Sequence, residues 1–236
     1  MKLIVAGGTG LVATEVIRQA LQMSEITSVI ALARKPVQLN NIDTSKLKTV
    51  IIDDYEKYPD QVKAEFAGAD ACIWTVAVTP MRSRGVDFAE VKRICQTCAL
   101  AGFKTMVEAG PSKPFRFLYI SAEGTPRDLT KKPLFMGEYQ LMRGETENMM
   151  LAFSADHDGV EVCVAQPGMV TSSVTFWRTA QAILFGFTNI FTRAIPNISR
   201  TELATAMLGQ VIRGFKKEPL TNADLLRLGR VGLAPR

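Results

Sequence analysis

The stretch "KLIVAGGTGLVATEVIRQAL", residues 2–21, decides the fold class. Residues 2–6 form a mostly apolar run that ends at Gly7 and Gly8. Apolar residues then recur at helical spacing, which predicts a helix over about residues 10–23. The inner stripe of this helix comprises Val12, Val16, Ile17, Ala20 and Leu21. The chain is therefore expected to open with a buried strand, a tight turn and an amphipathic helix.

Strands and helices continue to alternate along the chain. Further strands are expected at residues 28–34, 47–53, 70–78, 115–121 and 160–168. Helices are expected within residues 56–68, 86–108, 137–150 and 199–215, with Ser199 as the cap of the last one. The strands are almost entirely apolar, which indicates a parallel sheet covered on both faces. Right-handed crossovers then give an α/β fold with a doubly wound parallel sheet of the Rossmann type.

The length of 236 residues fits a single domain of this class. Residues 169–198 are rich in aromatic and amide side chains, and we expect them to form a small C-terminal subdomain on the substrate side. Four polar residues interrupt its apolar run 174–195, which therefore does not resemble a transmembrane span. We expect a lid over an apolar pocket; contact with a membrane surface is the alternative.

Charge and cysteine content limit the possible partners and compartment. The net charge of +5 arises from scattered Lys and Arg residues, which does not indicate nucleic acid binding. Four cysteines are too few for a disulfide framework, and no signal peptide is expected before the first strand, so a reducing, cytoplasmic location is expected. Cys95 and Cys98 form C-x-x-C, but without a second pair or a nearby histidine they are expected to be buried thiols and not metal ligands.

The glycine turn after the first strand has the pattern G-x-x-G-x-x-A. Gly7 allows the tight turn, Gly10 allows close approach of a diphosphate, and Ala13 lets the helix pack against the strand. Amide groups at the start of the helix are expected to bind that diphosphate. The residues predicted to form this dinucleotide site are Gly7, Thr9, Gly10, Leu11 and Val12.

The ends of the second and third strands indicate which dinucleotide is bound. An acidic residue after the second strand would bind the adenosine ribose, but this chain has Arg34 and Lys35 there. Two cations favour a 2′-phosphate and therefore NADP; two solvated charges in a turn are the alternative. Asp53 is expected beside the adenine amino group, although a role in capping a loop is equally open.

The glycine turn, Ser121 and the Y-x-x-x-[KR] pattern of "YQLMRGETENMM" (139–150) resemble the atypical and extended short-chain dehydrogenase/reductases. The resemblance is to proteins similar to the Tat-interacting oxidoreductase and to the NmrA-like families. It covers nearly the whole chain, because three further stretches also resemble this family. These are "FAGADACIWTVAVT" (66–79), "AQPGMV" (165–170) and "ISRTELATAMLGQVIRG" (198–214).

The resemblance implies roles for individual residues. Ser121 would orient the substrate oxygen, Tyr139 would transfer a proton, and Arg143 would take the place of the family's lysine. That lysine lowers the pKa of the tyrosine and binds the nicotinamide ribose. The further cofactor contacts that the resemblance implies are Ala77, Val78, Thr79, Pro167, Gly168, Met169 and Val170.

Two residues depart from the family pattern. Gln166 replaces the arginine of the R-P-G turn, and Arg143 replaces lysine. A guanidinium remains charged, so it can lower the pKa of a phenol and bind ribose, but it cannot shuttle a proton. The alternative is that Tyr139 is a core aromatic and Arg143 a surface cation paired with Glu147.

These features predict an NADPH-dependent reductase that acts on a carbonyl group of a mostly apolar small molecule. An isomerase, epimerase or dehydratase on the same fold is one alternative, and a non-catalytic regulator that senses NADP is another. The chain is expected to be a monomer or a homodimer.

Overall fold

The centre of the molecule is a parallel sheet, in a computed structural model that describes residues 1–83, 85–134, 136–172 and 197–233. Its strands are β1 (Lys2–Ala6), β2 (Ser28–Ala33), β3 (Leu47–Ile51), β4 (Ala71–Trp74), β5 (Phe115–Ile120), β6 (Val160–Gln166) and β9 (Leu220–Thr221). They lie in the order β3-β2-β1-β4-β5-β6-β9, and every neighbouring pair is parallel. The predicted Rossmann-type α/β fold is confirmed.

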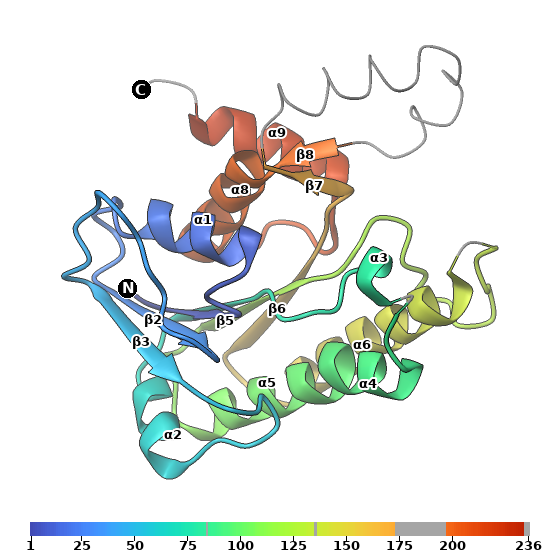
Figure 1. Cartoon of the computed structure of the whole chain (residues 1–236), viewed down its shortest axis with the longest axis horizontal. Coiled ribbons are helices and arrows are strands. Elements are labelled where there is room, and N and C mark those ends of the chain that lie inside the picture. The colour runs from blue at the N-terminus through green and yellow to red at the C-terminus, as the bar shows by residue number, and fades with distance from the viewer. Residues whose placement is uncertain (84, 135, 173–196, 234–236) are drawn as a thin grey trace.

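Helices cover both faces of the sheet (Figure 1). One face is covered by α1 (Leu11–Ala20), α8 (Arg200–Arg213) and α9 (Asn222–Leu233), and the other by α2 (Asp60–Phe66), α5 (Cys98–Glu108) and α6 (Gly137–Ala155). Successive side chains of a strand point to opposite faces. Leu3 of β1 therefore packs into one apolar cluster and Ile4 into the other, and both are fully buried. This is why the strands are apolar at nearly every position.

The helix expected at 86–108 forms as one run with an irregular middle. It consists of α4 (Phe88–Lys92), a π-helical turn η1 (Arg93–Thr97) and α5. A short helix, α3 (Pro80–Ser83), precedes it. The buried Tyr119 hydroxyl of β5 donates a hydrogen bond to the carbonyl oxygen of Cys95 at 3.1 Å. A backbone carbonyl in the π-helical turn thus has a partner in the sheet.

Several expected boundaries were wrong. The fourth strand ends at Trp74 instead of residue 78, so residues 75–79 form a loop at the edge of the sheet. The sixth strand ends at Gln166, and the chain continues as β7 (Met169–Thr171), which pairs with β8 (Asn197–Ser199). Helix α8 begins at the predicted Ser199 cap but is not the last element, because β9 and α9 follow it.

Residues 174–195, expected to form a lid, lie outside the described residues. The chain enters this region from β7 and leaves it into β8, and these two strands pair in parallel. Within the part of the chain that the structure describes, no helix is long and apolar enough to cross a membrane.

Candidate active site

The candidate site residues follow the carboxyl ends of six neighbouring strands. The register pairs Ala6 with both Leu32 and Trp74, and it pairs Ile120 with Ala165. Because these strands are parallel and in register, the segments that follow them meet at one edge of the sheet. In open α/β sheets this is the edge at which ligands bind.

The glycine turn is closed by backbone hydrogen bonds. The amides of Gly7 and Gly8 donate to the carbonyl oxygen of Leu32 at 2.9 and 3.0 Å, and the amide of Gly10 donates to that of Gly7 at 2.7 Å. Gly7 has a φ angle of +86°, and a Cβ atom there would lie 2.5 Å from the Oγ1 atom of Thr75. Any other residue at position 7 would therefore strain the turn and collide with the segment after β4.

The start of α1 is open to a ligand. No side chain of the described residues caps the helix at Gly10, and Thr9, Gly10 and Leu11 are exposed. The first amides of a helix need acceptors that the helix itself does not supply, and the helix dipole favours a negative charge there. The turn therefore fits a diphosphate, as the sequence predicts.

Arg34 and Lys35 are exposed beside this turn, and neither forms a hydrogen bond or an ion pair with another described residue. The Tyr55 hydroxyl donates to the same Leu32 carbonyl oxygen that closes the glycine turn, at 3.0 Å. Burial raises the pKa of Tyr55 to about 12, and the nearby charge of Arg34 opposes that rise. Arg34 lies two residues after Leu32, whose carbonyl oxygen closes the glycine turn. Asp53 is also exposed, two residues after the end of β3.

Tyr139 on α6 is buried, with only 6% of its surface exposed, and it packs against Val91, Cys95 and Met142. Its hydroxyl donates a hydrogen bond of 2.9 Å to the carbonyl oxygen of Val78, in the loop after β4. Burial raises the pKa of the phenol, whereas the charge of Arg143 opposes that rise. The net effect is a raised pKa, so the charge of Arg143 offsets only part of the effect of burial.

Arg143 is buried, with 2% of its surface exposed. Its guanidinium carbon lies 4.7 Å from the centre of the Tyr119 ring, and Nη2 donates to the carbonyl oxygen of Ile120. The Nε and Nη1 atoms have no hydrogen-bond partner among the described residues. The alternative of a surface cation paired with Glu147 is wrong, because Arg143 folds onto β5.

Ser121 directly follows β5 and is 7% exposed. Its amide donates to the carbonyl oxygen of Ala165 at 2.7 Å, and its hydroxyl donates to the Oγ1 atom of Thr125 at 3.4 Å. Among the described contacts, none joins Ser121 to Tyr139 directly. The structure therefore brings Ser121, Tyr139 and Arg143 to the ends of β4 and β5 without a hydrogen bond between them.

A buried polar network that no sequence pattern predicted is centred on Glu147, one turn of α6 after Arg143. Glu147, which is fully buried, accepts a hydrogen bond of 2.9 Å from Nε of Arg127. The Glu147 carboxylate also accepts hydrogen bonds of 3.0 and 3.1 Å from the side-chain amide of Gln166. Arg127 in turn donates a hydrogen bond to the carboxylate of Glu218. Since Arg127 already supplies the cation for Glu147, Gln166 is a neutral donor to the same carboxylate. This gives a physical reason for glutamine in place of arginine at position 166.

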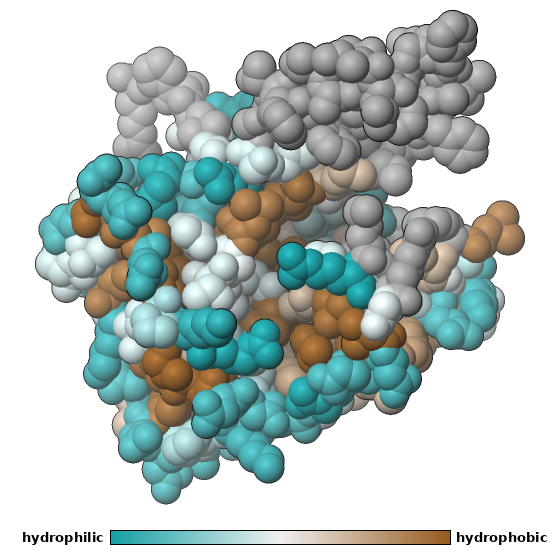
Figure 2. All heavy atoms as spheres, in the orientation of Figure 1, coloured by the Kyte–Doolittle hydropathy of each residue, from teal (hydrophilic) through white to brown (hydrophobic). Residues whose placement is uncertain are grey.

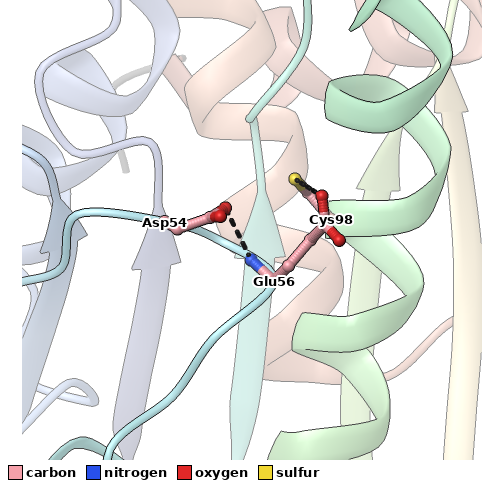
Figure 3. A group of neighbouring side chains, drawn as sticks. All are labelled: Asp54, Glu56 and Cys98. Atoms are coloured by element: carbon pink, nitrogen blue, oxygen red, sulfur yellow. Dashed lines mark hydrogen bonds between the residues drawn. The ribbon is translucent and has the colours of Figure 1, made fainter. Parts of the chain in front are cut away.

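Asp54, Glu56 and Cys98 offer ligand atoms within 4.8 Å of one another (Figure 3). However, Nη1 of Arg93 lies 3.2 Å from the Asp54 carboxylate and 2.7 Å from that of Glu56. The two negative charges are therefore paired with a guanidinium instead of being free for a metal ion.

The C-x-x-C thiols do not form a pair. All four cysteines are free and buried, and the expectation that Cys95 and Cys98 are buried thiols is confirmed. The Cys95 sulfur contacts the backbone of Val78, whereas that of Cys98 lies 4.0 Å from Glu56. Burial raises the pKa of Cys98 to about 12.

Large apolar side chains are exposed in the segments that follow the strands at this edge. They are Leu11, Val86, Phe88 and Met169. On the face drawn in Figure 2, apolar side chains gather near the middle, between polar ones. The four exposed side chains give the segments after the strands a partly apolar surface.

The family model described as NAD(P)H-binding matches residues 7–208. Among curated proteins, "Leucinostatins biosynthesis cluster protein T" from Purpureocillium lilacinum is 29% identical over 121 residues. That alignment covers 51% of this chain and 43% of the relative, so the chain matches less than half of that protein's length.

Solved structures share the fold at low sequence identity. UDP-glucose 4-epimerase from Thermotoga maritima has a TM-score of 0.69 at 14% identity, covering 98% of this chain and 82% of its own. MoeE5 in complex with UDP-glucose and NAD has a TM-score of 0.68 at 14% identity; the alignment covers 94% of this chain and 75% of MoeE5. The PhqB reductase domain from Penicillium fellutanum has a TM-score of 0.67 at 17% identity, covering 94% and 67%. These structures show a shared fold, and the family match over residues 7–208 is in line with the NAD(P)-binding resemblance seen in the sequence.

Proposed function

The chain belongs to the NAD(P)H-binding family, and from this we propose that it is an NADPH-dependent oxidoreductase. It would reduce a carbonyl group of a mostly apolar small molecule. The observation that supports the proposal most is at the glycine turn, where the helix start has no side-chain cap and Arg34 and Lys35 have no partner among the described residues. This arrangement fits a dinucleotide that carries a 2′-phosphate.

The cofactor would lie along the carboxyl edge of the sheet. The amides of the glycine turn would bind its diphosphate, Arg34 and Lys35 its 2′-phosphate, and Asp53 its adenine. The segments after β4 and β6 would contact the remaining part, through Ala77, Val78, Thr79, Pro167, Gly168, Met169 and Val170. When bound, the nicotinamide supplies the hydride.

The protein would supply the proton and orient the carbonyl group. Tyr139 would be the acid, because it is the buried phenol at the loop after β4 and has a buried cation nearby. Arg143 would lower the pKa of Tyr139, since a positive charge favours the phenolate over the phenol. Arg143 would also bind ribose hydroxyls through Nε and Nη1, which are buried and have no partner in the described part of the chain. Ser121, at the end of β5, would donate a hydrogen bond to the substrate oxygen.

The substrate side is proposed to be apolar. Leu11, Val86, Phe88 and Met169 are exposed at this edge. Residues 169–198 would form a substrate-side subdomain within the single domain 1–236. We also propose a reducing, cytoplasmic location, which fits four unpaired cysteines.

Two other functions remain candidates because a specific observation favours each. The epimerases among the structural neighbours favour a non-redox isomerase, epimerase or dehydratase that uses Tyr139 as the acid and base. The hydrogen bond from Tyr139 to Val78, with none to Ser121, favours a non-catalytic protein that senses NADP.

One assay separates the three functions. The purified chain is incubated with NADPH and a panel of apolar aldehydes and ketones, and oxidation of NADPH is followed by absorbance. We expect oxidation that depends on both the carbonyl compound and Tyr139. An epimerase would convert UDP-glucose without net change in added NAD, and a sensor would bind NADPH without turnover of any compound.

A further inference from the structure

Three hydrogen bonds join the turn after β6 to the loop after β5 and to the start of α9. The amide of Gly168 donates to Oδ1 of Asn222 at 2.8 Å. The amide of Asn222 donates to Oε2 of Glu123 at 3.0 Å, and the amide of Glu123 donates to the carbonyl oxygen of Pro167 at 2.9 Å. These bonds form a closed ring through three chain segments that are far apart in sequence.

The side chain of Asn222 is free for this contact because other residues cap α9. The Thr221 hydroxyl accepts a hydrogen bond from the Asp224 amide at 3.3 Å, and the Asp224 carboxylate accepts from the Thr221 amide at 3.1 Å. These reciprocal bonds form a capping arrangement. Asn222 is 1% exposed, and its Nδ2 atom has no partner among the described residues. The side chain of Asn222 thus contributes the acceptor Oδ1 to the ring. The amide of Gly168 is the donor, so the hydrogen bond requires an oxygen atom at this place.

The ring is anchored to the sheet on one side and to the candidate active site on the other. β9 pairs with β6, with Leu220 opposite Ala165 and Thr221 opposite Gln166, so Asn222 follows directly from a paired strand. Glu123 lies two residues after Ser121. Asn222 also lies beyond residue 208, where the match to the family model ends.

We propose that Asn222 and Glu123 are positioning residues for the nicotinamide half of the cofactor site. They hold the Pro167–Gly168 turn, and they fix its distance from the loop that carries Ser121. The inference rests on the proposed function, in which this turn contacts the cofactor. It adds that the C-terminal β9–α9 segment completes the site.

The test compares two probes that share the adenosine half of NADPH. The first is NADPH itself, and the second is 2′,5′-ADP, which has the 2′-phosphate but no nicotinamide. Asn222→Ala removes the acceptor for Gly168, and a buried donor without a partner is costly. We expect NADPH to bind at least about fivefold more weakly, which corresponds to about 1 kcal/mol, while the affinity for 2′,5′-ADP stays within about twofold.

Further variants separate positioning from loss of folding. Glu123→Ala is expected to weaken NADPH binding like Asn222→Ala, and the double variant is expected to be less than additive because both belong to one ring. Glu123→Gln keeps an acceptor oxygen and is expected to retain the parent affinity. Val231→Ala is the control on α9, since its side chain is 70% exposed, and it is expected to bind both probes as the parent does.

Three outcomes would overturn the inference. One is that Asn222→Ala and Glu123→Ala both bind NADPH as the parent does. Another is that they lose NADPH and 2′,5′-ADP equally, which would indicate a general structural defect. If the parent protein itself binds neither probe, the proposed function is wrong and the inference falls with it.

Discussion

Replacing Tyr139 by phenylalanine should separate catalysis from folding. The ring packs in an apolar cluster with Val91, Cys95 and Met142, and phenylalanine retains that packing. The change removes one hydrogen bond, from the hydroxyl to the carbonyl oxygen of Val78. Such a bond contributes about 0.5–1.5 kcal/mol, so the free energy of unfolding should fall by no more than this.

The same change should reduce turnover far more. A general acid typically contributes about a hundredfold to ten-thousandfold in rate, or about 2.7–5.4 kcal/mol in the barrier. The assay is NADPH oxidation with one active carbonyl compound, measured with urea unfolding and NADPH titration of the same samples. A Tyr139→Phe protein that turns over at the parent rate would refute the reasoning, because the tyrosine would then be only a core residue.

Variants of Arg143 give the pH dependence of this step. Burial raises the pKa of Tyr139 and the charge of Arg143 opposes that rise, so Arg143→Met should raise the pKa further. Since reduction requires the protonated phenol, activity is lost as pH rises through this pKa. The loss should therefore occur at higher pH in Arg143→Met than in Arg143→Lys, which keeps a cation. Profiles that coincide would exclude an electrostatic role for Arg143.

Two further predictions concern stability. A Cβ atom at Gly144 would overlap the carbonyl oxygen of Pro126, so Gly144→Ala should destabilise the protein by about 1–3 kcal/mol in urea unfolding, despite the better helix propensity of alanine. Gly85→Ala is the control, because a Cβ atom there meets nothing within 4 Å. Equal stabilities of the two variants would contradict the packing argument. Burial acts to raise the pKa of Asp224, but hydrogen bonds from Lys217 and Thr221 outweigh it and lower this pKa to about 2. Because the folded-state pKa is lowered, the stabilisation is present above about pH 4 and is lost as the pH falls towards 2. The shift corresponds to at most about 2 kcal/mol, and the exposure of Lys217 reduces the expectation to about 1–2 kcal/mol. Asp224→Asn should lose this amount at pH 7 and show a shallower loss of stability between pH 4 and 2; a parallel pH dependence in both proteins would contradict it.

The parallel sheet was predictable because its strands are apolar runs separated by helical patterns. The buried β1, for example, alternates its side chains between two covered faces, which requires an apolar run such as the one around Leu3 and Ile4. The glycine turn was also predictable, since the φ angle of Gly7 and its closeness to Thr75 favour glycine. The two-residue strand β9 was missed because a strand this short has no periodicity to detect.

The contacts of the site could not be predicted from spacing alone. Arg143 is four positions from both Tyr139 and Glu147 along the chain, so helical geometry allowed either residue as its partner. The packing of α6 on β5 directs Arg143 away from Glu147, because it places the guanidinium over the Tyr119 ring. Glu147 then paired with Arg127, which comes from a loop twenty residues earlier. The contact between Asn222 and Gly168 is also non-local, because it joins residues 54 positions apart.

We propose that the chain binds NADPH through the glycine turn and the cations after β2. The most direct measurement is calorimetric titration of NADPH and NADH into the parent protein and into the Arg34→Ala/Lys35→Ala double variant. We predict that the parent binds NADPH at least about tenfold more tightly than NADH, or by about 1.4 kcal/mol, and that the double variant loses this preference but keeps its affinity for NADH. Equal affinities in the parent, or tighter binding of NADH, would contradict the claim.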